Sequence, residues 1–62
     1  MKCSEALKIL KMDGWYEISQ RGSHIKMIHD VKEGTIIFPN HGSKELAKGT
    51  EKSLFKQAQI KR

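Results

Sequence analysis

The stretch WYEISQRGSHIKMIHD, residues 15–30, decides the fold of this 62-residue chain. It contains two runs of β-forming residues in which apolar and polar side chains alternate, WYEISQ (15–20) and HIKMIHD (24–30). The linking residues Arg21-Gly22-Ser23 are few and are centred on a glycine. Two such runs around a short glycine turn predict a β-hairpin.

Alternation with a period of two assigns these side chains to two faces of a sheet. His24 and Lys26 have the opposite phase from the apolar residues, so we expect them on the open face. His29 shares the apolar phase, and we expect it to pack or to lie at the edge of the core. The expected inward set is Tyr16, Ile18, Ile25, Met27, Ile36 and Phe38.

The sequence on either side of the hairpin predicts a helix before it and a third strand after it. SEALKILKMDG (4–14) has apolar residues at helical spacing, with Ser4 as its N-cap and Gly14 as its terminator. TIIFP (35–39) predicts the third strand, because proline ends a strand that it cannot extend by hydrogen bonding.

The last third of the chain predicts a connector and a second helix. The connector covers residues 40–50, with one helical turn at 44–47, and the helix TEKSLFKQAQI (50–60) is capped by Thr50. The resulting order is α-β-β-β-α, an α+β fold in which two helices cover one face of a three-stranded antiparallel sheet. Double-stranded-RNA-binding domains have the same order. We expect residues 1–62 to form a single domain.

The charge balance favours a polyanionic or an acidic partner. Twelve Lys and Arg residues stand against seven Asp and Glu residues, which gives a net charge of +5 spread along the whole chain. Basic domains bind nucleic acid by releasing its counterions. An acidic protein partner or a solvated surface accounts for the same charge.

Cysteine content and hydropathy indicate the compartment. The single cysteine, Cys3, excludes an internal disulfide and fits a reducing cytoplasm. No secretory signal is visible, and no apolar run is long enough to span a membrane. We therefore expect a cytoplasmic protein without membrane contact.

Four lysines follow a regular spacing in the second half of the chain. In one continuous helix these lysines would form a basic stripe that binds successive phosphates of a nucleic acid. We expect Gly49 to interrupt that helix. A solvated helix face is the alternative. The four residues are Lys44, Lys48, Lys52 and Lys56.

His24 is the open-face residue with the clearest chemical capacity. A histidine side chain takes up and releases a proton near neutral pH. RNA cleavage needs one group to remove the proton of the ribose 2′-OH and another to protonate the leaving 5′-oxygen. Arg21 and Lys26 flank His24 and can stabilise the charge that grows on the phosphate. Gly22 lets the backbone approach a ligand, but a lone exposed histidine is more often incidental.

The sequence offers no pattern for a metal or a nucleotide cofactor. His24, His29 and His41 match no common zinc-site spacing, so we expect no metal ion. The glycines are isolated and form no phosphate-binding loop, and no G-x-S-x-G motif is present. We therefore expect no cofactor.

Five short motifs occur in one order along the chain. They are DGW (13–15), GSH (22–24), GTIIFPNH (34–41), KELAKGT (44–50) and LFKQAQI (54–60). No single motif is specific, but the ordered set spans nearly the whole chain. At this length and charge, the set resembles the HicA family of bacterial toxin–antitoxin mRNA interferases.

This resemblance implies a double-stranded-RNA-binding-like fold and an endoribonuclease that cleaves mRNA without a ribosome. It also implies a HicB-type antitoxin that binds the toxin and masks its active site. The catalytic histidine of the family lies in the GSH motif, which here assigns catalysis to His24. No metal is needed, since the 2′-OH is an internal nucleophile. The expected RNA contacts are Arg21, Gly22, Ser23, Lys26, Lys44 and Lys48.

One position departs from the family pattern, and two other functions stay open. Gln59 stands where the family usually has glycine. Because glutamine adopts the left-handed conformation less readily, we expect the last helix to continue to Ile60. The alternatives to a nuclease are an RNA-binding module, in which His24 is only a contact, and a basic protein-interaction domain.

Overall fold

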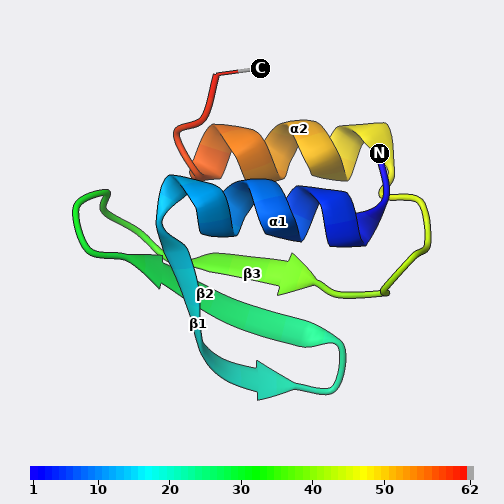
Figure 1. Cartoon of the computed structure of the whole chain (residues 1–62), viewed down its shortest axis with the longest axis horizontal. Coiled ribbons are helices and arrows are strands. Elements are labelled where there is room, and N and C mark those ends of the chain that lie inside the picture. The colour runs from blue at the N-terminus through cyan, green and yellow to red at the C-terminus, as the bar shows by residue number, and fades with distance from the viewer. Residues whose placement is uncertain (62) are drawn as a thin grey trace.

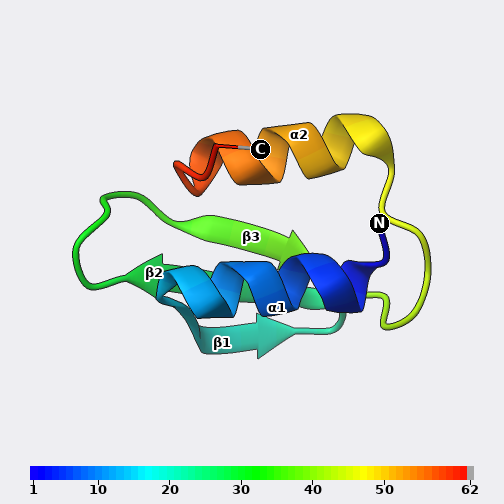
Figure 2. The same ribbon diagram turned by 45° about the horizontal axis from the view of Figure 1, so that its top comes forward.

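The computed structural model describes residues 1–61 as a three-stranded sheet with two helices on one face. The elements are α1 (Cys3–Asp13), β1 (Trp15–Arg21), β2 (His24–His29), β3 (Ile36–Pro39) and α2 (Lys48–Gln57). The strands pair antiparallel in the order β1-β2-β3, and both helices lie on the same side of them (Figures 1 and 2). The predicted α+β order is therefore confirmed.

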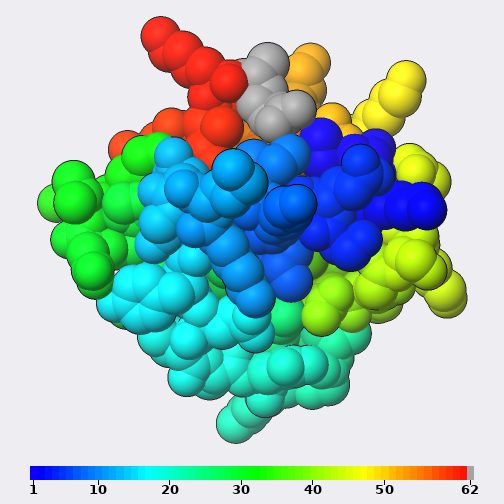
Figure 3. Space-filling view, in the orientation of Figure 1, coloured from blue at the N-terminus to red at the C-terminus, as the bar shows by residue number. Residues whose placement is uncertain are grey.

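The core fills the space between the helices and the sheet. α1 contributes Cys3, Ala6 and Leu10 from one face, as the spacing of its apolar residues predicts. The strands add Trp15, Ile25, Met27, Ile36 and Phe38, and the second half of the chain adds Leu46, Leu54, Phe55 and Ala58. In the space-filling view, α1 covers the middle of the molecule and the hairpin lies below it (Figure 3). Within residues 1–61, no helix is long and apolar enough to cross a membrane.

The predicted inward set is correct for β2 and β3 but wrong for β1. Tyr16 and Ile18 are 41% and 47% exposed, whereas Trp15 is buried. The chain enters β1 directly after α1, so Trp15 takes the first position under the helix, and its indole N–H donates to the Ala58 carbonyl at 3.3 Å. A β-bulge between Glu17 and Ser19 then leaves Ile18 without a partner in the ladder.

Both predicted N-caps are wrong, because α1 and α2 begin two and three residues earlier than the sequence predicts. Lys2 is the N-cap of α1, and Ser4 lies in the first turn. The Cys3 and Ser4 amides donate to the connector carbonyls of Lys44 and Gly42, at 2.9 and 3.0 Å. These bonds satisfy free amides of the first turn without a serine cap.

The connector and the start of α2 also differ from the prediction. The expected helical turn at 44–47 does not form, because Glu45 pairs with Lys2 in an isolated bridge. α2 begins at Lys48 after an N-cap at Ala47, so Thr50 lies inside the first turn and caps nothing.

The last helix does not continue to Ile60, contrary to the expectation from Gln59. Gln59 adopts the left-handed conformation at φ 57°, and α2 ends at Gln57. The Gln59 amide donates to Lys56 and the Ile60 amide donates to Phe55, at 3.1 and 3.0 Å. This pair of bonds is the Schellman arrangement.

A second interaction stabilises this helix end. The Lys32 ammonium donates to the carbonyls of Ala58 and Gln59 at 3.2 and 3.0 Å. A cation at a helix C-terminus is favourable because it complements the helix dipole and the free carbonyls. The same ammonium binds the Asp13 carboxylate at 2.6 Å, so it joins the ends of the two helices.

His29 lies at the edge of the core, as its phase predicts. Its Nδ1 accepts hydrogen bonds from the amides of Val31 and Lys32, at 3.0 and 3.1 Å. Its Nε2, which must therefore carry the proton, donates to the Asp13 carbonyl at 2.7 Å. His29 thus joins the end of α1 to the end of β2 and leaves no ring nitrogen for another ligand.

Candidate active site

The hairpin turn positions His24 at the first residue of β2. Gly22 and Ser23 form a two-residue loop between the paired residues Arg21 and His24. Gly22 has φ 56°, the conformation that a turn of this length requires at its first central residue. The Gln20 side chain donates to the Gly22 carbonyl at 2.9 Å and further fixes the loop.

The sheet register gives His24 two neighbours on the open face. His24 pairs with Arg21 on β1 and with Pro39 on β3. Lys26 is two residues further along β2, so its side chain points to the same face as His24. His24, Arg21 and Lys26 are all exposed. The structure thus brings together the predicted histidine and two of the predicted cations.

A main-chain hydrogen bond fixes the segment after β3 against the hairpin turn. The Asn40 amide donates to the Ser23 carbonyl at 2.6 Å. The Asn40 side chain in turn accepts from the Gly42 amide at 3.2 Å. His41 lies between them and is exposed, and its carbonyl accepts from the Lys44 amide at 3.3 Å. Hydrogen bonds to the hairpin turn and within the segment itself therefore hold the chain beside His24.

A hollow of about 420 Å³ opens beside His24, between β3 and α2. Its sheet side is lined by His24, Ile37 and Pro39. Its helix side is lined by residues of α2: Gly49, Thr50, Ser53, Leu54 and Gln57. His24 therefore borders a concave surface that is lined by both apolar and polar side chains, as ligand sites are.

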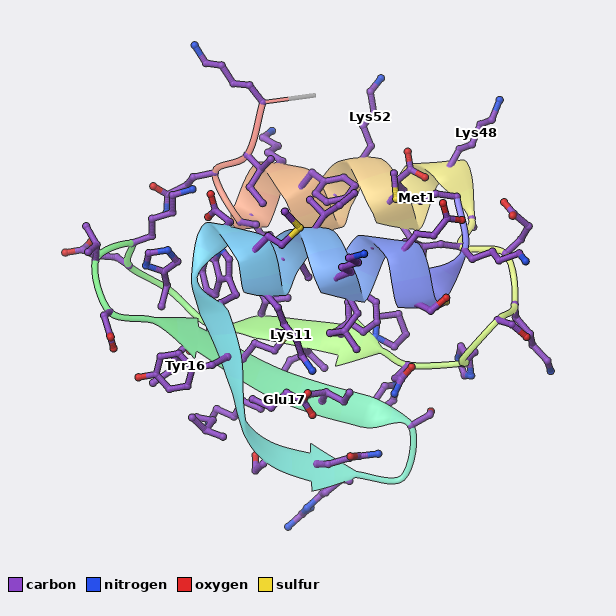
Figure 4. All side chains as sticks on the ribbon, viewed as in Figure 1. Met1, Lys11, Tyr16, Glu17, Lys48 and Lys52 are labelled. Carbon is purple, nitrogen blue, oxygen red and sulfur yellow. The ribbon has the colours of Figure 1, made fainter. Side chains whose placement is uncertain are left out.

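The cations beside His24 have no acidic partner, whereas most acidic side chains are engaged elsewhere. Within residues 1–61, no carboxylate lies within ion-pair distance of Arg21 or Lys26. Figure 4 shows Lys11 reaching toward Glu17, and their ion pair measures 2.7 Å. The remaining ion pairs of acidic residues involve Asp13, Glu45 and Glu51, away from the hairpin turn. The turn therefore presents positive charge that is available to an anion.

Lys44 and Lys48 are not brought together with His24. Lys44 is exposed in the connector, outside α2. Lys48 lies on the face of α2 opposite the hollow beside His24, and Figure 4 shows Lys48 and Lys52 pointing away from the sheet. Because α2 begins at Lys48, Gly49 does not interrupt the stripe of Lys48, Lys52 and Lys56.

A larger hollow of about 790 Å³ lies along this lysine stripe. Met1, Phe55 and Ile60 supply its apolar lining, and no histidine borders it. The Met1 amino group makes ion pairs there with Glu45 and Glu51, at 3.3 and 3.2 Å. The larger hollow thus lacks a histidine, and its charged groups are lysines, two glutamates and the Met1 amino group.

Sequence reasoning missed the residues that α2 contributes beside His24. Thr50 was assigned a capping role, and Ser53 and Gln57 were given none. The signal was present, since Gly49, Ser53 and Gln57 lie four residues apart and form a small, uncharged stripe next to the lysine stripe. The stripe could not be assigned to the site, because the sequence does not reveal that α2 packs along β3.

The described side chains form no cluster suited to a metal ion. Within residues 1–61, no group of three or more His, Cys, Asp and Glu side chains converges. His29 uses both ring nitrogens in hydrogen bonds to the backbone.

Comparison with known proteins relates nearly the whole chain to one family. A family model described as "HicA toxin of bacterial toxin-antitoxin" matches residues 3–60. The chain is also similar to a protein of Pseudomonas fluorescens (strain Pf0-1) that is named "Probable mRNA interferase HicA". The two are 39% identical over 61 residues, which is 98% of each chain.

Proposed function

Because this chain belongs to the HicA toxin family of bacterial toxin–antitoxin systems, we propose that it is an mRNA interferase, an endoribonuclease that uses His24 and needs neither a ribosome nor a metal ion. The observation that carries the proposal is the position of His24. It is exposed, it is paired with Arg21, and it borders a hollow large enough for part of a nucleotide. The similarity to a protein named as an mRNA interferase supports the same reaction.

In the proposed reaction, the ribose 2′-oxygen attacks the adjacent phosphorus. A bond forms between the 2′-oxygen and phosphorus, and the bond from phosphorus to the 5′-oxygen breaks. The products are a 2′,3′-cyclic phosphate and a 5′-hydroxyl. His24 either accepts the 2′-OH proton or donates a proton to the 5′-oxygen. The nucleophile belongs to the substrate, so no metal-bound water is required.

Arg21 and Lys26 are the proposed phosphate ligands beside the scissile bond. Both are exposed on the same face as His24, and neither has an acidic partner within residues 1–61. Their charge offsets the negative charge that develops on the phosphate oxygens in the transition state. The turn residues Gly22 and Ser23 are proposed to contact the same strand.

Lys44 and Lys48 are the proposed contacts to more distant phosphates. Both are exposed and follow the ordered segment that begins at Asn40. Such contacts strengthen binding without selecting a sequence, and their contribution falls as salt rises.

A toxin of this family acts with a cognate antitoxin, and we propose that a HicB-type protein covers the His24 face. Residues 1–62 would then form a single toxin domain. The open side of the sheet exposes apolar surface at Tyr16 and Ile37 beside the cations. A partner that covers this surface would bury apolar area and block His24 in one contact.

The test is cleavage of one long transcript in EDTA by purified wild type, His24→Ala and His41→Ala. His41→Ala is the matched control because it also removes an exposed histidine. We expect wild type and His41→Ala to cleave and His24→Ala to leave the RNA intact. Cleavage by His24→Ala at the wild-type rate would overturn the assignment of catalysis to His24.

The same experiment separates the two alternative functions. An RNA-binding module would retard the transcript on a gel in all three cases and cleave it in none. A protein-interaction domain would bind RNA weakly and without cleavage. Loss of wild-type cleavage in EDTA, restored by added Mg²⁺, would overturn metal independence alone.

A further inference from the structure

The hollow beside His24 has polar groups on α2 that the proposed reaction does not use. The Gln57 amide donates to the Ser53 hydroxyl oxygen at 3.1 Å. Both side chains are exposed and line the hollow. Within residues 1–61, the Gln57 carbonyl oxygen and the Ser53 hydroxyl proton have no other partner. The pair therefore presents one acceptor next to one donor.

From this arrangement we propose that Ser53 and Gln57 form a subsite for one unstacked nucleobase next to the scissile phosphate. The inference rests on the proposed function, because it takes His24 as the point of cleavage. On their pairing edges, A and C place an exocyclic donor next to a ring acceptor, whereas G and U place an exocyclic acceptor next to a ring donor, so a fixed donor and acceptor favour one of these two classes. RNA-binding proteins read unstacked bases through such edges.

The apolar lining of the hollow suits the flat face of a base. Ile37 and Pro39 line its sheet side, where Ile37 is 52% exposed, and the largely buried Leu54 lines its helix side. About half of the Ile37 side chain is thus open to a ligand. A base that lies against Ile37 and Pro39 would cover them and would turn its polar edge toward α2.

The size and position of the hollow allow a base to enter it. Its volume of about 420 Å³ falls in the lower part of the range for small-molecule sites. Because His24 lines the hollow, a base inside it would belong to a nucleotide next to the cleaved bond. The subsite therefore confers base preference at the cut site, while the cations bind phosphates of any sequence.

Gly49 contributes to this space by having no side chain. It lines the hollow, and a Cβ at this position would meet no atom within 4 Å. Its backbone is helical, so a larger residue is compatible with α2. A bulky substitution at Gly49 is thus a way to fill the hollow while leaving Ser53 and Gln57 in place.

Binding to uncleavable oligonucleotides tests the subsite independently of catalysis. The probes are four 2′-fluoro homopolymers, of A, C, G and U, which lack the 2′-OH nucleophile. We expect wild type to discriminate between the best and worst base by about tenfold, as a paired donor and acceptor typically do. We expect Ser53→Ala and Gln57→Ala to reduce this ratio to about threefold or less, and Gly49→Leu to weaken binding of all four probes.

Controls distinguish a lost subsite from a lost fold. Ser43→Ala removes the same hydroxyl from an exposed connector residue and should keep the wild-type ratio. Thermal unfolding should be close to wild type for Ser53→Ala and Gln57→Ala, since alanine favours a helix. Equal binding of the four probes by wild type would overturn the subsite, as would an unchanged ratio in both variants.

Mapping of cleavage products separates this inference from the proposed function. If wild type cuts at preferred bases and Gln57→Ala cuts with a weaker preference, both the nuclease proposal and the base subsite are supported. If wild type does not cleave RNA but the binding ratio still depends on Ser53 and Gln57, the nuclease proposal fails and the base subsite stands. If cleavage depends on His24 while cut sites are unchanged in both α2 variants, the subsite fails and the nuclease stands.

Discussion

The Asn40 amide donates a 2.6 Å hydrogen bond to the Ser23 carbonyl, and this bond ties the end of β3 to the turn that precedes His24. It joins two loops that are well separated along the chain. Because it uses only main-chain atoms, most substitutions at either position preserve it. The geometry around His24 therefore depends on a contact that side-chain identity does not reveal.

Asn40→Pro should impair cleavage because proline has no amide hydrogen to donate. Residue 39 is already proline in a strand, so the preceding backbone is compatible with the change. If the bond positions His24 against Pro39, its loss should lower kcat by up to about 10²-fold with little change in KM. Asn40→Ala keeps the amide and should stay much closer to wild type. Equal activities for the two variants would show that this bond does not position the site.

Arg21→Ala should reduce cleavage more than the loss of an equal charge elsewhere. Arg21 pairs with His24 across the hairpin and has no acidic partner within residues 1–61. If it stabilises charge in the transition state, kcat should fall by about 10²-fold. Lys8→Ala is the control, because Lys8 is exposed on α1 and its loss changes the net charge equally. Single-turnover rates at saturating RNA measure the difference. Equal losses of rate in the two variants would show that Arg21 acts only through the overall charge of the protein.

Much of the fold could be predicted from the sequence because its strongest signals are local. The alternation over residues 24–29 and the glycine turn at Gly22 are properties of adjacent residues, and both appear in the structure. The phase of β1 could not be predicted, because Trp15 takes the inward position directly after α1 and a bulge between Glu17 and Ser19 then interrupts the alternation. The helix starts were wrong for a similar reason: the amides of α1 are satisfied by a connector some 40 residues away.

The same difference between local and long-range contacts decides which residues of the candidate site could be predicted. Arg21, His24 and Lys26 were placed together because a hairpin turn brings neighbours in sequence onto one face. Ser53 and Gln57 were missed because they approach His24 only through the packing of α2 along β3. The left-handed backbone of Gln59 could not be predicted for the same reason. It is stabilised by the Lys32 ammonium, which binds the Gln59 carbonyl from a distant part of the chain.

Gly14→Ala should destabilise the protein more than Gly34→Ala. Both glycines have positive φ, of 112° and 96°, so alanine is strained at either position. At Gly14, a Cβ would also lie 2.7 Å from Nε2 of His29, whereas nothing lies within 4 Å at Gly34. We expect the free energy of unfolding to fall by about 1 kcal/mol for Gly34→Ala and by about 2 kcal/mol or more for Gly14→Ala. Urea unfolding measures both, and equal losses would mean that His29 moves aside freely.

The ion pairs of the Met1 amino group make stability depend on alkaline pH. The hydrogen bonds that this amino group donates to Glu51 and, less strongly, to Glu45 raise its pKa above the usual value of about 8. A group whose pKa is raised by folding stabilises the folded state fully below its unfolded pKa, and that contribution is lost as the pH rises through the folded pKa. The free energy of unfolding in urea should therefore decline as the pH rises above about 8. Glu51→Gln removes the larger cause of the shift, so its stability should be lower at pH 7 and should decline less over this range. Parallel declines in the two proteins would show that another group controls the alkaline transition.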